Sequence, residues 1–443
     1  MVGLGAMQMN REYDVIIIGA GIIGAAIGLE MARAGKKTLN IDKLPAAGYG
    51  STSNSCAIIR THYSTLQGTA LAWESLFYWK QWADYLGTPD ELGLARFKQT
   101  GVLIFKSNDS EFDTWRRHHD ALSIPYEEWD TKAVQEKMPF LSTNVYGPPK
   151  LPDDPSFFDA GQGEISGGFF VPEGGYVSDP QLSTHNIQRA AEAAGGEFLF
   201  NQQVVDILKE DNRCTGVVLN GGRQILAPVV VNAAGPHSFV INRLADVEKD
   251  MNITTRALRH EVHFVPAPEG VDIEKQGAVM SDDDIGGYCR PEVGNAILIG
   301  SQDPKCDAQE WVEDPDNYDT EVSEAQWRAQ VYRLALRIPE LPIPAHPRGL
   351  VDLYDVTDDW IPIYDKSSLD GFYLAVGTSG NQYKTAPVVG KFMAKLIDAC
   401  EKGQEHDNEP VMYSCPKTGV DLDLSFYSRL RKINADSSFS VLG

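Results

Sequence analysis

Residues 13–42 read YDVIIIGAGIIGAAIGLEMARAGKKTLNID, and this stretch decides the fold. The apolar run Val15–Ile18 is typical of a parallel strand that is buried on both faces. It ends at Gly19, Gly21 and Gly24, which have the spacing G-x-G-x-x-G, and the residues that follow show helical periodicity. The pattern therefore predicts a strand, a tight turn and a helix.

This turn is predicted to bind the pyrophosphate of a dinucleotide. Gly19 permits the tight turn, Gly21 lets the backbone approach the phosphates, and Gly24 lets helix and strand pack closely. The unpaired N–H groups at the start of the helix would face the phosphates. A second apolar segment, Thr38–Ile41, ends at Asp42, whose carboxylate is placed to accept a hydrogen bond from a ribose 2′-OH. A tight turn that binds nothing is the alternative, and it leaves this full pattern unexplained.

Length and charge narrow the classes of function. A chain of 443 residues exceeds the usual size of a single core, so two domains are expected. The net charge of −23 argues against a nucleic-acid partner, because phosphate backbones require a basic face. An anionic ligand must therefore be met by a few specific cations.

The sequence indicates no metal site and no membrane span. Its 6 cysteines include no C-x-x-C motif, and none has metal-like spacing with histidine. The apolar segment Val15–Leu29 is shorter than the about 20 residues that a spanning helix needs. The first ten residues lack a basic region and a cleavage site, so no signal peptide is predicted. We expect a cytoplasmic protein, with peripheral attachment to the inner face of a membrane as an open alternative.

Three later segments carry features of a ligand site. Residues 48–55 form a loop rich in Gly, Ser and Thr, which is suited to wrap phosphates. Arg60 directly follows an apolar segment, where it is positioned to clamp a carboxylate. Val229–Pro236 is a second buried strand that ends in small residues, and Lys384 stands at the start of a helix after the strand Phe372–Val376.

The rest of the chain is expected to form a second sheet and a polar tail. Short strands between residues 258 and 300 suggest a domain of their own, and the tail from Asp421 shows one possible helix. The adjacent His118 and His119 cannot share one helix face, so we predict that they lie at the surface.

These segments together resemble the D-amino-acid-oxidase-like flavoproteins, most of all the sarcosine oxidase and dimethylglycine dehydrogenase branch. The resemblance is carried by GAGIIG with Asp42, GSTSNSCAIIRTHY (50–63), VVVNAAGPHS (229–238), GGYCRPEVGNAILIGSQD (286–303) and DGFYLAVGTSGNQYKTAPVVGKFMA (370–394). It implies an α/β fold with a Rossmann-like FAD-binding domain and a discontinuous second domain on a mainly antiparallel sheet. The implied divisions are 10–94, 174–253 and 354–412 for the FAD-binding domain, 95–173 and 254–353 for the substrate domain, and 413–443 for a C-terminal tail.

The resemblance also implies noncovalent FAD and a set of residues that hold it. Ser51 and Thr52 would lie near the flavin, Val204 would meet the adenine, and Gly380 and Tyr383 would approach the isoalloxazine. The complete cofactor set is Gly19, Gly21, Gly24, Asp42, Lys43, Ser51, Thr52, Val204, Ala233, Gly235, Gly380 and Tyr383.

In the sarcosine oxidase pattern, the positions of Arg60 and Lys384 hold the substrate carboxylate, and the position of Tyr288 lines the substrate pocket. Burying a carboxylate costs several kcal/mol unless cations replace its water, which supports this pair independently. His260, His263 and Arg290 are candidates for the pocket wall or for a second carboxylate.

Three departures limit the resemblance. Asp352 or its neighbours stand where monomeric sarcosine oxidases attach flavin through a cysteine. Leu298 replaces the lysine that activates oxygen in those enzymes, so fast reaction with oxygen is in doubt. Ala57 replaces a further arginine.

The sequence therefore predicts FAD-dependent oxidation of the carbon–nitrogen bond of a small secondary or tertiary amino acid. The imine would hydrolyse to an amine and an aldehyde or keto acid, and electrons would pass to oxygen or to a respiratory or electron-transfer carrier. Sarcosine, dimethylglycine, iminodiacetate-like N-carboxymethyl amines and proline all fit the pattern. A flavin dehydrogenase of a 2-hydroxy acid or glycerol phosphate, or a non-catalytic dinucleotide-binding subunit, remain alternatives.

Overall fold

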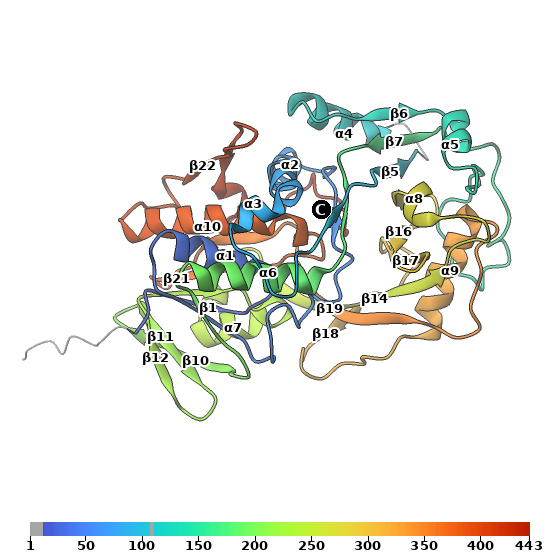
Figure 1. Ribbon diagram of the computed structural model, residues 1–443. Helices are drawn as coiled ribbons and strands as arrows, with labels where there is room; N and C mark the ends of the chain where they lie inside the picture. The colour runs from blue at the N-terminus through green and yellow to red at the C-terminus, as the bar shows by residue number, and fades with distance from the viewer. Residues whose placement is uncertain (1–11, 107–109) are drawn as a thin grey trace, which may run out of the picture.

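The computed structural model describes residues 12–106 and 110–443, and two large sheets dominate it (Figure 1). The first sheet has six strands in the order β20-β21-β13-β1-β2-β9. Its strands are β1 (Val15–Ile18), β2 (Thr38–Ile41), β9 (Glu197–Leu199), β13 (Val229–Asn232), β20 (Ile363–Lys366) and β21 (Phe372–Val376). All neighbours are parallel except β20, which pairs antiparallel with β21 at the edge.

Both faces of the first sheet are covered, which explains why β1 is apolar throughout. Val15 and Ile17 belong to a core that includes side chains of α1 (Ile22–Arg33), α6 (Pro180–Ala193) and α10 (Ala386–Glu401). Ile16 and Ile18 face the opposite core, which contains α7 (Ser238–Ala245) and a three-stranded sheet. That sheet consists of β10 (Val204–Glu210), β11 (Arg213–Leu219) and β12 (Gln224–Leu226).

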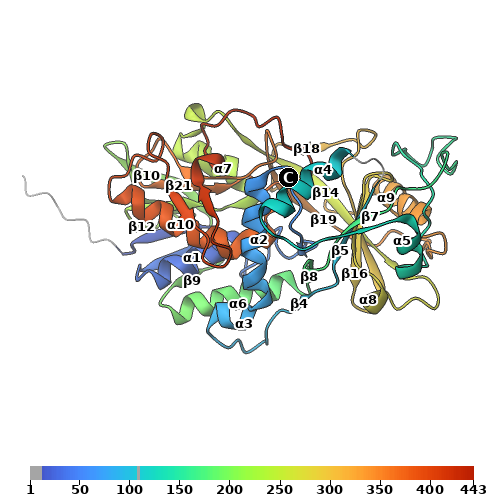
Figure 2. The same ribbon diagram turned by 90° about the horizontal axis from the view of Figure 1, so that it is seen from above.

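The second sheet lies beside the first and is mainly antiparallel (Figure 2). Eight of its strands run in the order β18-β14-β17-β16-β15-β5-β7-β6, and β19 also pairs with β14. They are β5 (Val102–Phe105), β6 (Glu127–Trp129), β7 (Gly168–Val171), β14 (Thr255–Pro266), β15 (Val279–Asp282), β16 (Gly287–Glu292), β17 (Ala296–Ser301), β18 (Glu310–Val312) and β19 (Gly349–Thr357). Its core contains side chains of α5 (Thr131–Lys137), α8 (Ile273–Gln276) and α9 (Glu324–Arg337).

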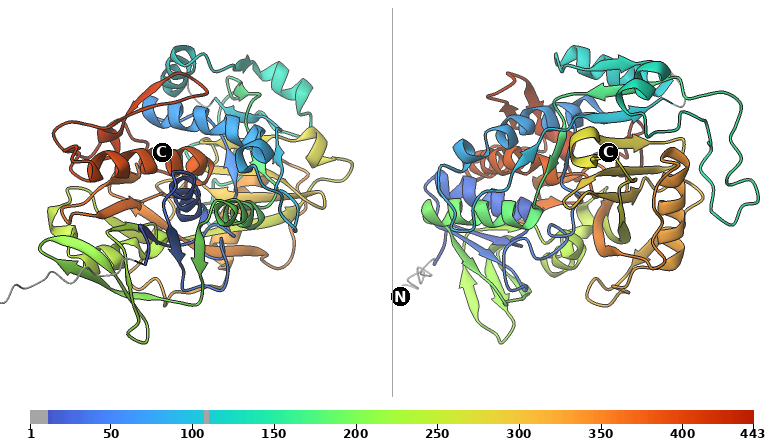
Figure 3. Two further views of the ribbon diagram at one scale, coloured as in Figure 1. Left: turned by 60° about the vertical axis from the view of Figure 1, so that its left-hand side comes forward. Right: turned by 45° about the vertical axis from the view of Figure 1, so that its right-hand side comes forward.

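The remaining elements join or flank the two sheets (Figure 3). A small sheet connects β3 (Ile58–Ile59), β8 (Gly175–Val177) and β4 (Phe97–Lys98). The other elements are α2 (Leu66–Lys80), α3 (Trp82–Leu86), α4 (Ser110–Ala121), the hairpin of β22 (Met412–Ser414) and β23 (Asp421–Asp423), and the 3₁₀ helices η1 (Gly235–His237), η2 (Glu248–Asp250), η3 (Tyr383–Thr385) and η4 (Leu424–Tyr427).

The predicted fold class is confirmed by this combination of a Rossmann-like parallel sheet with a mainly antiparallel second sheet. The domain boundaries stay a prediction, and residues 10 and 11 at the start of the first boundary lie outside the described part. So do the first ten residues, for which no signal peptide is predicted. None of the described helices has the length and apolar character needed to cross a membrane.

The expectation that His119 lies at the surface is wrong. His119 is fully buried, with its Nδ1 2.8 Å from the Trp115 carbonyl and its Nε2 3.1 Å from the Thr61 hydroxyl. The one helix of the tail in the described residues is the short 3₁₀ helix η4, and the tail runs back to a position between the two sheets (Figure 1). The burial of His119 depends on a contact with Thr61, which is distant in the sequence.

Candidate active site

One large cavity, of about 740 Å³, is lined by residues from both sheets. Its size lies within the range of about 300–1,000 Å³ that is usual for small-molecule and cofactor sites. Its lining includes all twelve residues of the predicted cofactor set, together with Arg60, Tyr288 and Lys384. Positions far apart in sequence are thus brought into one site.

The glycine turn leaves no room for side chains at two of its positions. Gly19 has a φ of +113°, and a Cβ there would lie 2.3 Å from the Ala233 carbonyl oxygen. A Cβ on Gly24 would lie 2.3 Å from the Gly19 carbonyl oxygen, so this glycine allows α1 to approach β1. At Gly21 the nearest atom would be the Thr52 hydroxyl oxygen, at 3.1 Å, which leaves the backbone open toward the cavity.

The start of α1 suits a phosphate group. No acidic side chain lies in its first turn, and its Gly21 N-cap offers no side-chain hydrogen bond. The Ile22 amide donates to the Thr52 hydroxyl at 3.1 Å. A pyrophosphate placed here would meet free N–H groups and the positive end of the helix dipole.

Asp42 stands at the end of β2, as the ribose site requires. Its carboxylate accepts hydrogen bonds from the amides of Ala20, at 2.8 Å, and Leu44, at 2.9 Å. Burial raises the pKa of Asp42, while these amides act in the opposite direction. The glycine turn, the start of α1 and Asp42 together fit the dinucleotide part of FAD.

Lys43 lines the same end of the cavity but is already paired. Its ammonium contacts Asp316 and lies 2.7 Å from Nε2 of His237. Asp316 belongs to the chain between β18 and α9, so this contact joins the two sheets across the cavity. A direct role of Lys43 toward the cofactor stays a prediction.

The segment between β2 and β3 places Ser51 against Asp352. The Ser51 hydroxyl donates to the Asp352 carboxylate at 3.1 Å and to the Leu353 carbonyl at 2.9 Å. Asn54 donates to the same carboxylate at 2.7 Å, and burial raises the pKa of Asp352. Ser51 and Asn54 thus hold the Asp352 carboxylate at the cavity wall, and noncovalent attachment of FAD stays a prediction.

Arg60 is buried, and within the described part of the chain its hydrogen bonds all go to backbone carbonyls. Its terminal nitrogens reach the carbonyl oxygens of His62, of Val441 at 2.9 Å and of Leu442 at 2.8 Å. The guanidinium carbon lies 4.3 Å from the centre of the Tyr63 ring. Burial lowers the pKa of Arg60.

Lys384 lies near the same ring. Its ammonium donates to the Asn381 carbonyl at 2.6 Å and to the Tyr63 hydroxyl at 3.1 Å. Burial lowers the pKa of Lys384 well below its usual range, and the charge of Arg60 acts in the same direction. Two buried cations therefore share one aromatic neighbour and one cavity.

Tyr288 also lines the cavity. Its hydroxyl lies 3.3 Å from the Cys56 sulfur, and burial raises the pKa of Tyr288 well above its usual value. Tyr288 and Tyr354 both pack against a cluster that includes Val441. The Tyr383 hydroxyl lies 2.7 Å from the Ser183 hydroxyl, and this hydrogen bond fixes the orientation of the tyrosine ring. A fixed ring suits the predicted role of Tyr383 beside the isoalloxazine.

The structure does not place His260, His263 or Arg290 on the cavity wall. Arg290 donates to the carbonyls of Cys56 and Pro291 and pairs with Glu292, which leaves it no role toward a second carboxylate. His260 stacks on Tyr354 with a ring separation of 4.1 Å, and His263 is fully buried. Leu298 is buried in β17.

Sequence reasoning missed several residues of the cavity wall. His62 lies two residues after Arg60, so the quoted motif contains it without indicating a role. Tyr354 lies two residues after Asp352, in a segment whose pattern indicates no role for it. Val441 and Leu442 carry no sequence signal, because their contact with Arg60 is made by backbone carbonyls.

Comparison with known proteins agrees with this geometry. A family model described as FAD dependent oxidoreductase (DAO) matches residues 14–396. Glycine oxidase of Geobacillus kaustophilus is 24% identical over 404 residues, covering 89% of this chain and 95% of the relative. Sarcosine oxidase subunit beta of Rhodobacter capsulatus is 24% identical over 398 residues, covering 88% and 86% of the two chains.

The crystal structure of L-proline dehydrogenase from P. horikoshii shows the same fold. Its TM-score is 0.74 at 22% identity, with 95% of this chain and 97% of that chain covered. The family match spans the glycine turn, both cavity cations and the strands that carry them. The chain therefore belongs to the DAO family of FAD-dependent oxidoreductases.

Proposed function

We propose that this enzyme oxidises the carbon–nitrogen bond of a small secondary or tertiary amino acid whose carboxylate is held by Arg60 and Lys384. One observation carries the proposal: both cations are buried in the cavity, and among the described residues no carboxylate pairs with either. Two buried like charges without a counter-ion are costly, and an anionic ligand relieves that cost.

The chain contributes position and charge compensation. Arg60 and Lys384 would fix the carboxylate, while Tyr288 and Tyr354 would enclose the amine end between aromatic side chains. Bound FAD supplies the two-electron acceptor for the oxidation of the carbon–nitrogen bond. The imine product would then hydrolyse to an amine and an aldehyde or keto acid. The names of the two sequence relatives, glycine oxidase and sarcosine oxidase, support a small amino acid as the substrate.

A phosphate-bearing substrate fits the cavity less well. The Lys and Arg residues that line it are Lys43, Arg60 and Lys384, and Lys43 already contacts Asp316. A dianionic phosphate would need more free donors than this arrangement offers. Glycerol phosphate and 2-hydroxy acids therefore serve as comparison substrates in the test.

The test compares a carboxylate substrate with its neutral amide. Reduction of bound flavin is followed with sarcosine, dimethylglycine, iminodiacetate and proline, and with N-methylglycinamide as the amide of sarcosine, with oxygen or with a dye acceptor. We expect Arg60→Met and Lys384→Met each to raise KM for the carboxylate substrate by about 10- to 100-fold, because a hydrogen bond to a charged group contributes about 1.5–3 kcal/mol. The preference for carboxylate over amide should fall by the same factor.

Lys98→Met is the matched control, since Lys98 pairs with Glu274 outside the cavity. FAD content, measured from the visible absorption, should be unchanged in all three variants. If both cavity variants keep the preference for carboxylate over amide, the assignment of Arg60 and Lys384 is wrong. If no amine of the panel reduces the flavin, but glycerol phosphate or a 2-hydroxy acid does, the substrate class is wrong.

A further inference from the structure

We propose that residues 441–443 form a movable wall of the substrate pocket, which occupies Arg60 with backbone carbonyls and yields it to a substrate carboxylate. The inference rests on the proposed function, because it takes Arg60 as the carboxylate ligand. It assigns residues 441–443 to the substrate pocket, although no sequence motif indicates a role for them.

The contacts of this segment, named here the tip, converge on the cationic end of the cavity. Both terminal nitrogens of Arg60 donate to carbonyl oxygens, and two of these acceptors belong to Val441 and Leu442. The Gly443 carbonyl accepts from the amide of Ser64 at 3.1 Å and also from its hydroxyl. The tip therefore covers the place where a carboxylate would meet Arg60.

The same segment also closes the aromatic wall. Val441 packs with Leu258, Val356 and Trp360, and the rings of Tyr288 and Tyr354 contact this cluster. Val441 and Leu442 both line the cavity. One short segment thus contacts both Arg60 and the cluster against which Tyr288 and Tyr354 pack.

His62 provides independent evidence that a polar ligand is missing while the tip lies against Arg60. It lines the cavity, is 1% exposed, and neither ring nitrogen has a hydrogen-bond partner among the described residues. A buried polar group without a partner is unfavourable, and a polar ligand that replaced the tip would remove this penalty.

The tail is anchored firmly before the tip and weakly at the approach to it. Arg431 donates to both carboxylate oxygens of Asp359, and the Ser437 hydroxyl donates to the backbone carbonyl of Asp359. Beyond this point Phe439 is 45% exposed and has a φ of +51°, a conformation that is unfavourable for a large side chain. Residues 438–440 are therefore the part of the tail in which a change of backbone conformation would displace the tip and leave the anchor in place.

A carboxylate is a better hydrogen-bond acceptor for Arg60 than the backbone carbonyls of the tip. A neutral carbonyl accepts a hydrogen bond from a guanidinium less strongly than a carboxylate, which can also bind in a bidentate manner. A substrate carboxylate therefore competes with the Val441 and Leu442 carbonyls, whereas a neutral isostere does not.

The test loosens the tip and measures the binding of an unreactive carboxylate. Propionate, and propionamide as its neutral isostere, are titrated into the FAD-bound enzyme, and the shift in visible flavin absorption gives each Kd. We expect Val441→Gly/Leu442→Gly to bind propionate about tenfold more tightly relative to propionamide, because the tip keeps its carbonyls but loses the side chains that hold it in place. Leu430→Gly/Ile433→Gly is the matched control, since both residues are exposed parts of the same tail and lie outside the cavity lining.

A second measurement uses the unmodified enzyme. The amides of Leu442 and Gly443 bond to the side chain and the carbonyl of Ser440, at 3.2 and 3.0 Å. Saturating propionate should speed their hydrogen exchange, and propionamide should not. The movable wall is wrong if the tip variant has the same preference for propionate over propionamide as the unmodified enzyme. It is also wrong if propionate leaves the hydrogen exchange of the Leu442 and Gly443 amides unchanged or makes it slower. If Arg60→Met weakens propionate binding in the same experiments, the proposed function survives that failure; if propionate binds none of the proteins, both proposals fall.

Discussion

Lys384 shows how burial and a neighbouring charge act together on one side chain. Burial is the largest cause of its lowered pKa, and the charge of Arg60 is the next. Only the protonated ammonium attracts a carboxylate, so Lys384 contributes to binding below its lowered pKa and stops contributing as the pH rises through that value. Tyr63 contacts both cations and keeps them in one place.

We therefore predict that KM for a carboxylate substrate rises with pH well below the range in which an exposed lysine loses its proton. In Arg60→Met one of the two causes is removed, so the pKa of Lys384 should rise and the increase in KM should move to higher pH. Steady-state kinetics as a function of pH measure both effects, with Lys98→Met as the control. An increase that stays at the same pH in Arg60→Met would show that the two charges are not coupled.

At the scale of single elements, the β1–α1 turn depends on two different properties of glycine. At Gly24 the problem is packing, because a Cβ would collide with the Gly19 carbonyl and push α1 away from β1. At Gly21 a Cβ would meet a single side-chain atom, the Thr52 hydroxyl oxygen at 3.1 Å, which a small shift of Thr52 can accommodate. Packing and ligand approach can therefore be separated by substitution at neighbouring positions.

We expect Gly24→Ala to destabilise the flavin-free protein by about 1–3 kcal/mol, the usual cost of overpacking a close contact. Gly21→Ala should leave the stability of the flavin-free protein nearly unchanged and weaken FAD binding, because the new methyl group occupies space beside the phosphates. Thermal unfolding of the flavin-free protein and fluorescence titration with FAD measure the two quantities. Equal loss of stability in both variants would contradict the distinction.

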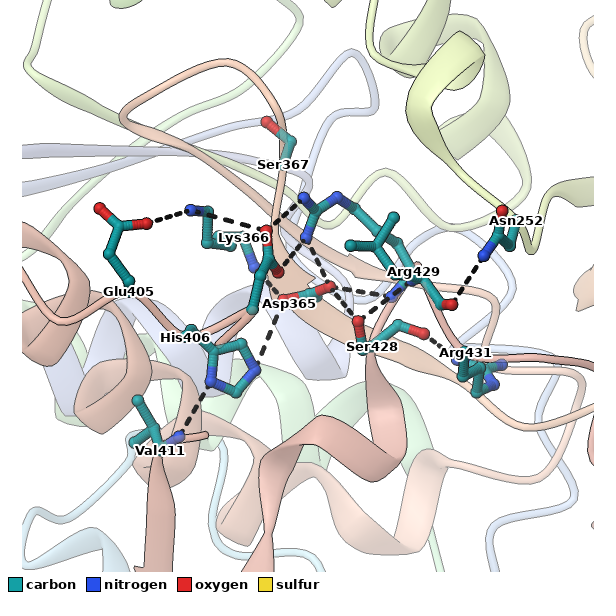
Figure 4. A network of polar contacts seen from close by, with 12 residues as sticks. Asn252, Asp365, Lys366, Ser367, Glu405, His406, Val411, Ser428, Arg429 and Arg431 are labelled. Carbon is teal, nitrogen blue, oxygen red and sulfur yellow. Dashed lines mark hydrogen bonds and ion pairs between the residues drawn. The ribbon is translucent and has the colours of Figure 1, made fainter. Parts of the chain in front are cut away.

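At the scale of the whole molecule, the tail is joined to the first sheet by a buried polar network (Figure 4). Asp365 of β20 is fully buried and accepts from Arg429 at 3.0 Å, from its amide and from the Ser428 hydroxyl. Arg429 also binds both carboxylate oxygens of Asp407, at 2.9 and 2.8 Å. This network lies at the start of the segment that leads to Arg60.

Arg429→Met should destabilise the protein by about 3–5 kcal/mol, because it leaves a buried carboxylate without its partner. Lys366→Met is the matched control and should cost less than about 1 kcal/mol, since Lys366 is partly exposed and its two ion pairs are as long as 3.6 and 3.8 Å. Urea unfolding at neutral pH measures both changes. A loss as small for Arg429→Met as for Lys366→Met would mean that the network does not hold the tail.

Much of this protein follows from local sequence pattern alone. The apolar run of β1, the glycines after it and Asp42 predict the strand, the turn and the ribose site, because each property depends on residues close together in the chain. Arg60 and Lys384 follow from the two motifs that contain them, and the structure brings both into one cavity. The Rossmann-like sheet and the mainly antiparallel second sheet are likewise confirmed.

Only the tertiary structure decides what those residues contact. It pairs Lys43 with Asp316, buries His119 against Thr61, and brings Val441 to Arg60. These contacts join residues distant in sequence, so local periodicity carries no information about them. The contact at Arg60 is the clearest case, because it is made by backbone carbonyls, which every residue type possesses and no pattern of side chains can encode.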